Sequence, residues 1–187
     1  MFDPIDGGIF SQAGDYSFKS PSYEKNIYEN ANAIILLASA YKYFKKRIYK
    51  EAAGRIMAFL ESEMMYRNKG FITYVTLTKN TSESTYYKYS LEELQKVFPQ
   101  RWKKIAHALG MDITEDAKKY QTISNTKEYW YITFEELETL KKIRKTRQKE
   151  VIYDKRVMTG YNCRTAIAYC AMAQVTQKGE KKEYLAM

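Results

Sequence analysis

Histidine and cysteine, on which many catalytic and metal sites depend, are scarce in this sequence. Its 187 residues include one histidine, His107, and two cysteines. A single histidine excludes any proton-exchange mechanism that needs a histidine pair, and we interpret His107 as an ordinary, partly buried helix residue. No run has the ligand spacing of a zinc site or the glycine pattern of a phosphate loop. We therefore expect no metal and no cofactor.

The two cysteines, Cys163 and Cys170, lie in a segment that we predict to be helical. A spacing of seven residues puts them on one side of the helix but about 10 Å apart along its axis. That separation exceeds the reach of a disulfide bond. Two free thiols are typical of a reducing cytoplasm, which is the location that we predict.

Long apolar runs are also missing. Residues 1–6 show neither the charged start nor the apolar centre of a signal peptide. The most apolar run, residues 31–40, contains Asn32, is followed by Lys42, and is too short to span a bilayer. We expect no membrane partner.

Tyrosine and positive charge are plentiful. The chain has 18 tyrosines and a formal net charge of +9. Tyrosine rings suit half-buried walls and grooves as well as cores, and the charge favours acidic partners. Nucleic acid is not an expected partner, because no nucleic-acid-binding motif is present. We interpret the most basic run, residues 141–149, as a solvated helix face.

Two long helices are predicted near the start of the chain. The first covers residues 23–44, with Ser22 as its N-cap and Glu24 near its positive end. The second covers residues 48–66, and the short joint between them predicts an antiparallel helical hairpin. Apolar residues at three- and four-residue steps predict two buried stripes. The stripes are Ile27, Ala31, Ile34, Ile35, Ala38 and Tyr41 in the first helix, and Ile48, Ala52, Ile56 and Phe59 in the second.

Shorter elements follow. Residues 71–77 and 85–89 predict the two strands of a β-hairpin around a polar loop. Capping boxes at Ser90 and Thr133 each predict the start of a helix. A further helix is predicted over residues 101–109 and is closed by Gly110. A last helix is predicted over residues 159–177, with Ile167, Cys170 and Ala171 on its apolar face. The chain is thus predicted to be mainly α with a small β-hairpin.

Three separated blocks carry a resemblance to a known family. The first block aligns without a gap to the pattern FDxIGGGFHRY, D, W, PHFEKMLYDNA. The middle block matches the ends of the pattern GFYSSxDADSEGxEGxYYxW. The last block resembles the run DDKVLTSWN. These patterns belong to the thioredoxin-domain-containing proteins typified by spermatogenesis-associated protein 20, which the chain resembles over most of its length. The matching positions are residues 2–8, Asp15, Phe18, Pro21, residues 23–25, residues 28–31, residues 70–71, residues 86–87 and residues 154–162.

The resemblance implies a partial α/α toroid, similar to N-acylglucosamine 2-epimerases and six-hairpin glycosidases. In such a toroid, helical hairpins ring a central funnel and small β-hairpins cover its mouth. We expect residues 1–187 to form a single domain that holds about the first half of the ring, without the thioredoxin domain of those proteins. A half-ring would expose apolar helix faces, so we expect a homo-oligomer or a complementary chain to cover them.

The sequence departs from the family at its polar positions. Phe10 and Ser22 stand where the family has histidines, and residues 76–80 replace its acidic cluster. These departures imply a divergent, non-catalytic toroid protein that would bind a sugar-like ligand or a protein partner through a tyrosine-rich mouth. The candidate ligand contacts are Phe18, Tyr23, Tyr28, Tyr87, Tyr161 and Asn162, with Tyr74, Tyr86 and Tyr89 beside them. Simple wall packing is the competing interpretation of these tyrosines.

Two other functions stay open. The first is a carbohydrate-active isomerase, epimerase or hydrolase that would use the carboxylates of Asp15, Glu24 and Asp154. Structural roles compete for these residues, including an ion pair with Lys25 or Arg156. The second is a basic surface that binds nucleic acid, which predicts affinity that falls steeply with salt.

Overall fold

The computed structural model describes residues 1–16, 21–66, 69–78, 84–123 and 131–176. The described chain is mainly helical with small antiparallel sheets, as predicted. It divides into two compact units, each built from three separate segments. Unit 1 contains Met1–Asp6, Phe10–Glu24 and Thr76–Ile152, and unit 2 contains Gly7–Ile9, Lys25–Val75 and Tyr153–Met187. Neither unit is a continuous stretch, so the organisation of residues 1–187 as a single domain stays a prediction.

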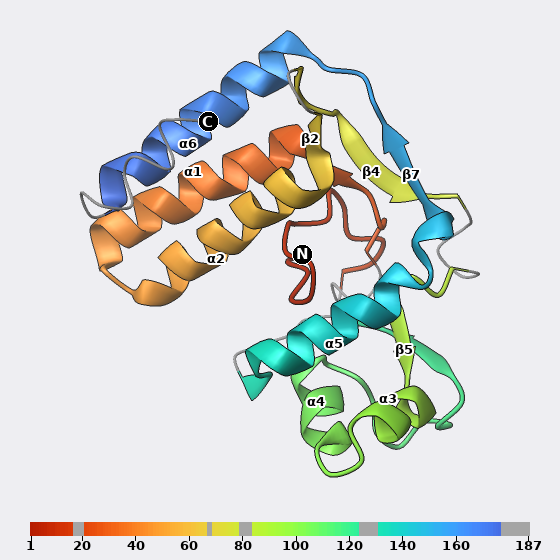
Figure 1. Ribbon diagram of the computed structural model, residues 1–187. Helices are drawn as coiled ribbons and strands as arrows, with labels where there is room; N and C mark the ends of the chain where they lie inside the picture. Colours follow the sequence, from red (N-terminus) through yellow and green to blue (C-terminus); the bar gives the residue numbers. More distant parts are fainter. Residues whose placement is uncertain (17–20, 67–68, 79–83, 124–130, 177–187) are drawn as a thin grey trace. The chain divides into compact units, whose positions relative to one another are not determined.

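Three helices form the body of unit 2. Helix α1 (Ile27–Phe44) packs against both α2 (Arg47–Phe59) and α6 (Thr159–Val175), and Figure 1 shows the three side by side. A π-helical turn, η1 (Leu60–Met64), continues α2. The predicted antiparallel hairpin of the first two helices is confirmed. The buried residues of α1 are Ile27, Asn30, Ala31, Ile34 and Ala38, close to the predicted stripe.

The predicted start of the first helix is wrong. The N-cap is Asn26, whose Oδ1 accepts a hydrogen bond from the Tyr28 amide at 2.8 Å, and not Ser22. Tyr23 has a φ of 55°, and Lys25 and Asn26 form strand β1 (Lys25–Asn26). Glu24 therefore precedes the helix, and Glu29 is the acidic residue in its first turn.

The predicted buried faces of two helices are also wrong in part. In α2, Ile48 is 42% exposed, and the buried residues are Ala53, Ile56, Met57 and Phe59. In α6, Ile167 is 52% exposed and Cys170 is exposed, whereas Thr165, Ala168, Tyr169, Met172 and Ala173 are buried. Apolar residues surround α6 on all sides, so the pattern alone could not select the face that packs on α1.

The predicted β-hairpin does not form between its expected strands. Strand β4 (Tyr74–Leu77) lies in a sheet of order β1-β4-β7, where β7 is Val151–Asp154. Strand β5 (Lys88–Ser90) pairs instead with β6 (Tyr120–Thr122), and β2 (Met65–Tyr66) pairs with β3 (Gly70–Phe71). The two segments have strand propensity, but their partners are distant in sequence. Of the predicted loop, residues 79–84, residues 79–83 lie outside the described residues.

The helices of unit 1 begin where the caps predict. Ser90 Oγ accepts from the Glu93 amide at 3.1 Å and starts α3 (Leu91–Val97). Thr133 and Glu136 form a reciprocal capping box at α5 (Phe134–Lys145). Helix α4 (Trp102–Ala108) lies between these two in the sequence, and a short 3-10 turn, η3 (Gln148–Glu150), follows α5.

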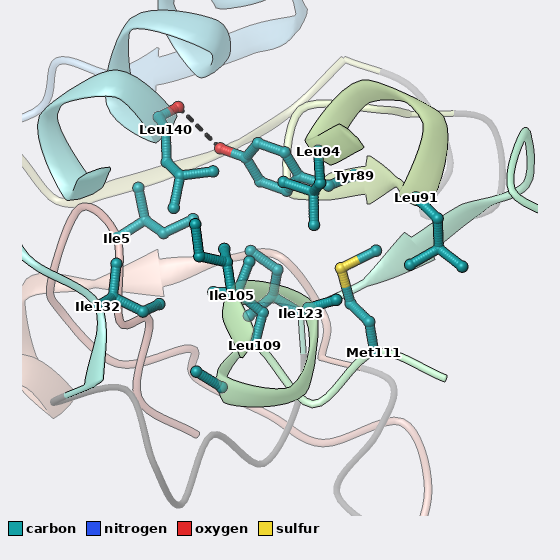
Figure 2. Packing of buried hydrophobic residues seen from close by; sticks show 12 residues of the cluster. Ile5, Tyr89, Leu91, Leu94, Ile105, Leu109, Met111, Ile123, Ile132 and Leu140 are labelled. Atoms are coloured by element: carbon teal, nitrogen blue, oxygen red, sulfur yellow. Dashed lines mark hydrogen bonds between the residues drawn. The ribbon is translucent and has the colours of Figure 1, made fainter. Parts of the chain in front are cut away.

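The main core of unit 1 gathers residues from the N-terminal segment, β5, the helices α3, α4 and α5, and the segments that connect them (Figure 2). Its buried members are Ile5, Tyr89, Leu91, Leu94, Ile105, Ala106, Ala108, Leu109, Met111, Ile123, Ile132 and Leu140. The Tyr89 hydroxyl donates to the Leu140 carbonyl at 2.8 Å, which satisfies the one polar atom on the ring. This core holds α4 and α5 in place, and these two helices bear the charged residues described below.

In unit 2, a glycine pair passes close to α2. Gly7 and Gly8 have φ values of 84° and 76°, and a Cβ on Gly7 would lie 2.3 Å from the Arg55 carbonyl oxygen. The fully buried Lys25 ammonium donates to the Gly7 carbonyl at 2.7 Å and lies 4.3 Å from the centre of the Phe59 ring. Only glycine satisfies both the left-handed backbone and this close approach.

We predict that Gly7→Ala destabilises the protein by about 2–4 kcal/mol, from left-handed strain together with overpacking. Gly54 in the middle of α2 is the control, because a Cβ there meets nothing within 4 Å. Gly54→Ala should stabilise by about 0.5–1 kcal/mol through helix propensity. Urea unfolding of both variants measures the two effects, and equal stabilities would contradict the packing described.

Candidate functional site

The polar centre of unit 1 is a buried arginine with two carboxylates. Arg144 in α5 is 1% exposed, and its Nη1 donates to Asp3 Oδ2 and to Asp6 Oδ2, each at 2.6 Å. Asp3 is also 1% exposed, and its Oδ1 accepts from the Ile5 amide at 3.0 Å. Burial opposes the charge on Arg144, but Asp3 and Asp6 outweigh it and raise the arginine pKa well above its usual value. One guanidinium thus pairs with two carboxylates, of which the Asp3 side chain is 1% exposed and the Asp6 side chain 17% exposed.

Tyrosine rings surround this guanidinium. Its central carbon lies 4.9 Å from the ring centre of Tyr87, 5.9 Å from that of Tyr86 and 6.0 Å from that of Tyr89. Burial raises the pKa of Tyr87 well above its usual value, and burial likewise raises that of Tyr89. The raised pKa disfavours the phenolate form of Tyr87 and Tyr89, so neither is suited to act as a general base.

Two of the candidate ligand contacts, Tyr23 and Tyr87, meet in the same region. Their rings stack with centres 5.1 Å apart, and Phe10 packs edge-on against both. The two tyrosines are 2% and 3% exposed, and the Tyr23 hydroxyl shares a 2.6 Å hydrogen bond with Thr122 Oγ1. Their faces are covered by one another, which favours the packing interpretation over a ligand-binding wall. Phe10, which occupies a histidine position of the resembled pattern, completes this packing.

The other candidate contacts lie in unit 2. Tyr28 and Tyr161 approach with ring centres 5.3 Å apart. Asn162 Oδ1 accepts from the Phe71 amide at 2.7 Å, and its Nδ2 donates to the Phe71 carbonyl at 3.0 Å. Asn162 thus holds the backbone of β3 against α6. Phe18 lies outside the described residues.

The candidate catalytic carboxylates are divided between the units. Asp15 and Glu24 belong to unit 1, and Asp154 belongs to unit 2. Both oxygens of Asp154 accept from Arg156 Nε at 2.9 Å, and this hydrogen bonding lowers the aspartate pKa. An ion pair with Arg156 was the structural role that competed with catalysis for Asp154.

An open groove on unit 1 has a different composition. It is about 610 Å³ in volume and is lined by Arg101, Lys103, Lys104, His107, Ile113 and Tyr131. Arg101 is fixed in place, because its Nε pairs with Glu136 Oε1 at 2.8 Å and its Nη2 donates to the Tyr131 carbonyl at 3.0 Å. The Tyr131 side chain is 61% exposed and Ile113 is 48% exposed. Three cations, of which Arg101 is paired with Glu136, line the groove beside an aromatic and an aliphatic surface.

The sequence did not predict this groove. The interpretation of His107, one of its lining residues, as partly buried is wrong. Helix α4 buries Ile105, Ala106 and Ala108, so His107 is exposed on the opposite side. One signal was present: Lys103 and Lys104 precede His107 by four and three residues, which places all three on one face. Ile113 lies just beyond the end of α4 and Tyr131 comes from a later segment, and neither carried such a signal.

Within the residues that the structure describes, no group of histidine, cysteine and carboxylate side chains could hold a metal ion. The same part of the chain contains no helix with the length and apolar character needed to cross a membrane. Cys163 and Cys170 are free, as predicted, and both are exposed. A scan against protein-family models and a search of curated proteins both give no match to this chain.

We predict that Arg144→Met destabilises the protein by about 3–5 kcal/mol, because Asp3 would stay buried without its counter-charge. Arg47, in an exposed pair with Glu51, is the control, and Arg47→Met should cost no more than about 0.5 kcal/mol. Adding Asp3→Asn to Arg144→Met should recover part of the loss, with a coupling energy above about 1 kcal/mol. Additive losses in guanidinium unfolding would show that the two charges do not interact.

We predict that stability falls as pH rises above about 10. Tyr87 and Tyr89 have raised pKa values in the folded state, whereas the unfolded chain loses these protons near the ordinary value of 10.0. Their contribution is therefore complete below pH 10 and declines above it, by about 1.4 kcal/mol per pH unit for each tyrosine. Unfolding curves between pH 8 and 11 measure the slope. Tyr89→Phe should reduce this slope, whereas Tyr43→Phe, at an exposed site, should not. Identical slopes in the two variants would refute the assignment of the pH dependence to the buried tyrosines.

Proposed function

We propose that this protein is a non-catalytic binding protein that holds a small anionic, sugar-like ligand in the groove on α4. The observation that carries this proposal is the combination of charge and surface in one place. Lysines and an anchored arginine line the same groove as an exposed tyrosine ring and an isoleucine. A volume of about 610 Å³ lies within the roughly 300–1,000 Å³ typical of small-molecule sites.

Each part of the groove has a task in this proposal. Lys103 and Lys104 would bind a phosphate or carboxylate group of the ligand through charge-assisted hydrogen bonds. The face of Tyr131, which carries partial negative charge, would pack against the C–H groups of a sugar ring. Arg101 would position Tyr131 through its carbonyl and add to the positive potential.

The filled centre of unit 1 supports the absence of catalysis. Arg144 pairs with Asp3 and Asp6 there, and Tyr23 and Tyr87 cover each other. Asp154 is engaged by Arg156. A carbohydrate-active enzyme that uses Asp15, Glu24 and Asp154 stays the alternative function, but no contact described above favours it.

The wider context is also a proposal. The chain would be a divergent, partial α/α toroid related to the spermatogenesis-associated protein 20 family, located in the cytoplasm. A second copy or a complementary chain would cover the exposed apolar residues of α6, such as Ile167 at 52% exposure. The hairpin of α1 and α2 and the small sheets support this kinship.

We predict that glucose 6-phosphate binds to the protein and that glucose does not, when both are tested by isothermal titration calorimetry in low salt. Lys103→Ala/Lys104→Ala should weaken binding at least tenfold, because two charge-assisted contacts are lost. Lys96→Ala/Lys142→Ala, with the same change of charge outside the groove, should leave affinity unchanged. Tyr131→Ala should weaken binding of glucose 6-phosphate but not of inorganic phosphate.

Two results would contradict the proposal. Equal losses in the groove and control variants would remove the groove as the site. Turnover of glucose 6-phosphate seen by NMR and abolished by Glu24→Gln would show that the protein is an enzyme.

A further inference from the structure

The joint between α1 and α2 presents an unusual surface that the groove does not use. Residues 41–50, here called the hairpin tip, read Tyr-Lys-Tyr-Phe-Lys-Lys-Arg-Ile-Tyr-Lys and contain five cations, four aromatic residues and no acid. All of them belong to unit 2. Figure 1 shows the hairpin tip at the end of α1 and α2 that is remote from β2.

Apolar side chains at the hairpin tip are widely exposed. Tyr43 is 82% exposed, Phe44 is 57% exposed and Ile48 is 42% exposed. Leu36, 70% exposed, lies seven residues before Tyr43 and hence on the same side of α1, so the apolar surface continues along the helix. Exposed apolar residues that gather in one place mark an interaction surface more often than single ones do.

Cations flank these apolar residues on both sides. Lys42, Lys45 and Lys46 are exposed, and the Arg47 side chain, which pairs with Glu51 just beyond the tip at 2.7 Å, is 88% exposed. Long basic side chains can keep their charged ends in a polar layer while their stems lie along apolar surface. The hairpin tip therefore complements a partner that is negatively charged at its surface and apolar just beneath.

Two backbone hydrogen bonds close the hairpin tip. Lys45 has a φ of 58° and closes α1, with its amide donating to the Tyr41 carbonyl at 2.9 Å. The Tyr49 amide donates to the Lys46 carbonyl at 3.1 Å, which starts α2. A turn with paired backbone groups can enter a poorly hydrated layer at lower cost than an open loop.

We propose that the hairpin tip docks on an anionic phospholipid surface. Tyr43, Phe44 and Ile48 enter the boundary between headgroups and acyl chains, and the flanking cations contact the headgroups. This inference is independent of the groove and of its ligand. The expectation of no membrane partner concerned spanning segments, and no helix among the described residues could cross a membrane. Surface binding depends instead on an amphipathic patch and not on the length of an apolar run.

Single-stranded nucleic acid is the competing anionic partner, and the ring geometry disfavours it. Stacking of bases needs open aromatic faces along a groove. Phe44 packs edge-on against Tyr43, with centres 5.0 Å apart at 78°, and lies 6.0 Å from Tyr49. Ile48 offers no ring at all. A close-packed aromatic and aliphatic tip suits lipid better than bases.

The test is sedimentation of the full chain with vesicles of phosphatidylcholine alone or with 30% phosphatidylserine, at 0.1 M salt. We expect binding only to the anionic vesicles. Lys45→Gln/Lys46→Gln should reduce the partition coefficient about 25-fold, or roughly fivefold for each cation near the surface. The matched control, Lys142→Gln/Lys145→Gln on α5, removes the same charge elsewhere and should change it less than about twofold.

Insertion is tested separately with Phe44→Trp as a reporter. The added tryptophan should shift to shorter emission wavelength on anionic vesicles and be quenched by lipids brominated in the acyl chains. Phe44→Ser should weaken binding while leaving the thermal unfolding midpoint unchanged. The proposal is overturned by an absence of vesicle binding, by equal effects of tip and control variants, by an unquenched reporter, or by a tip that binds a single-stranded oligonucleotide but not vesicles.

Discussion

The contact of Arg144 with Asp3 and Asp6 is the interaction on which unit 1 depends. It joins α5 to a segment 141 residues earlier, and it does so where both Arg144 and Asp3 are 1% exposed. A buried charge without its partner is costly, so the N-terminal segment and α5 are stable only together. Ile5, next to this segment, then enters the main core, and Tyr86, Tyr87 and Tyr89 close around the guanidinium.

Two asparagines within the blocks that carry the resemblance make hydrogen bonds to backbone groups and do not form a binding or catalytic site. Asn30 accepts from the Ile9 amide at 2.7 Å and donates to the Ile9 carbonyl at 3.1 Å. Asn162 makes the same two bonds with Phe71, and a Cβ on Gly70 would lie 2.6 Å from its Oδ1. Each asparagine side chain projects from a helix and makes the pair of backbone hydrogen bonds that a neighbouring strand would otherwise make. Under the proposed kinship, such positions would persist after the catalytic side chains were replaced.

Local features were the predictable part of the fold. Caps at Ser90 and Thr133, the helical hairpin and the closing Gly110 all depend on residues a few positions apart, and the structure has them. Strand pairing was not predictable, because β4 and β5 pair with strands that lie far from them in the sequence. The face of α6 was missed because its apolar residues point in every direction. The groove was missed for a related reason: Tyr131 joins α4 through Arg101, and only the folded core brings them together.

The interleaving of the two units bears on how the polypeptide is made. Both units take segments from the first 24 residues and from beyond position 140. During synthesis, neither unit can complete its packing until the late segments have left the ribosome. Until then, the apolar faces of the early helices stay uncovered. Contacts between such distant segments also slow folding, because the intervening chain must close first. The nascent chain is therefore expected to depend on chaperones more than a protein of this size with consecutive domains.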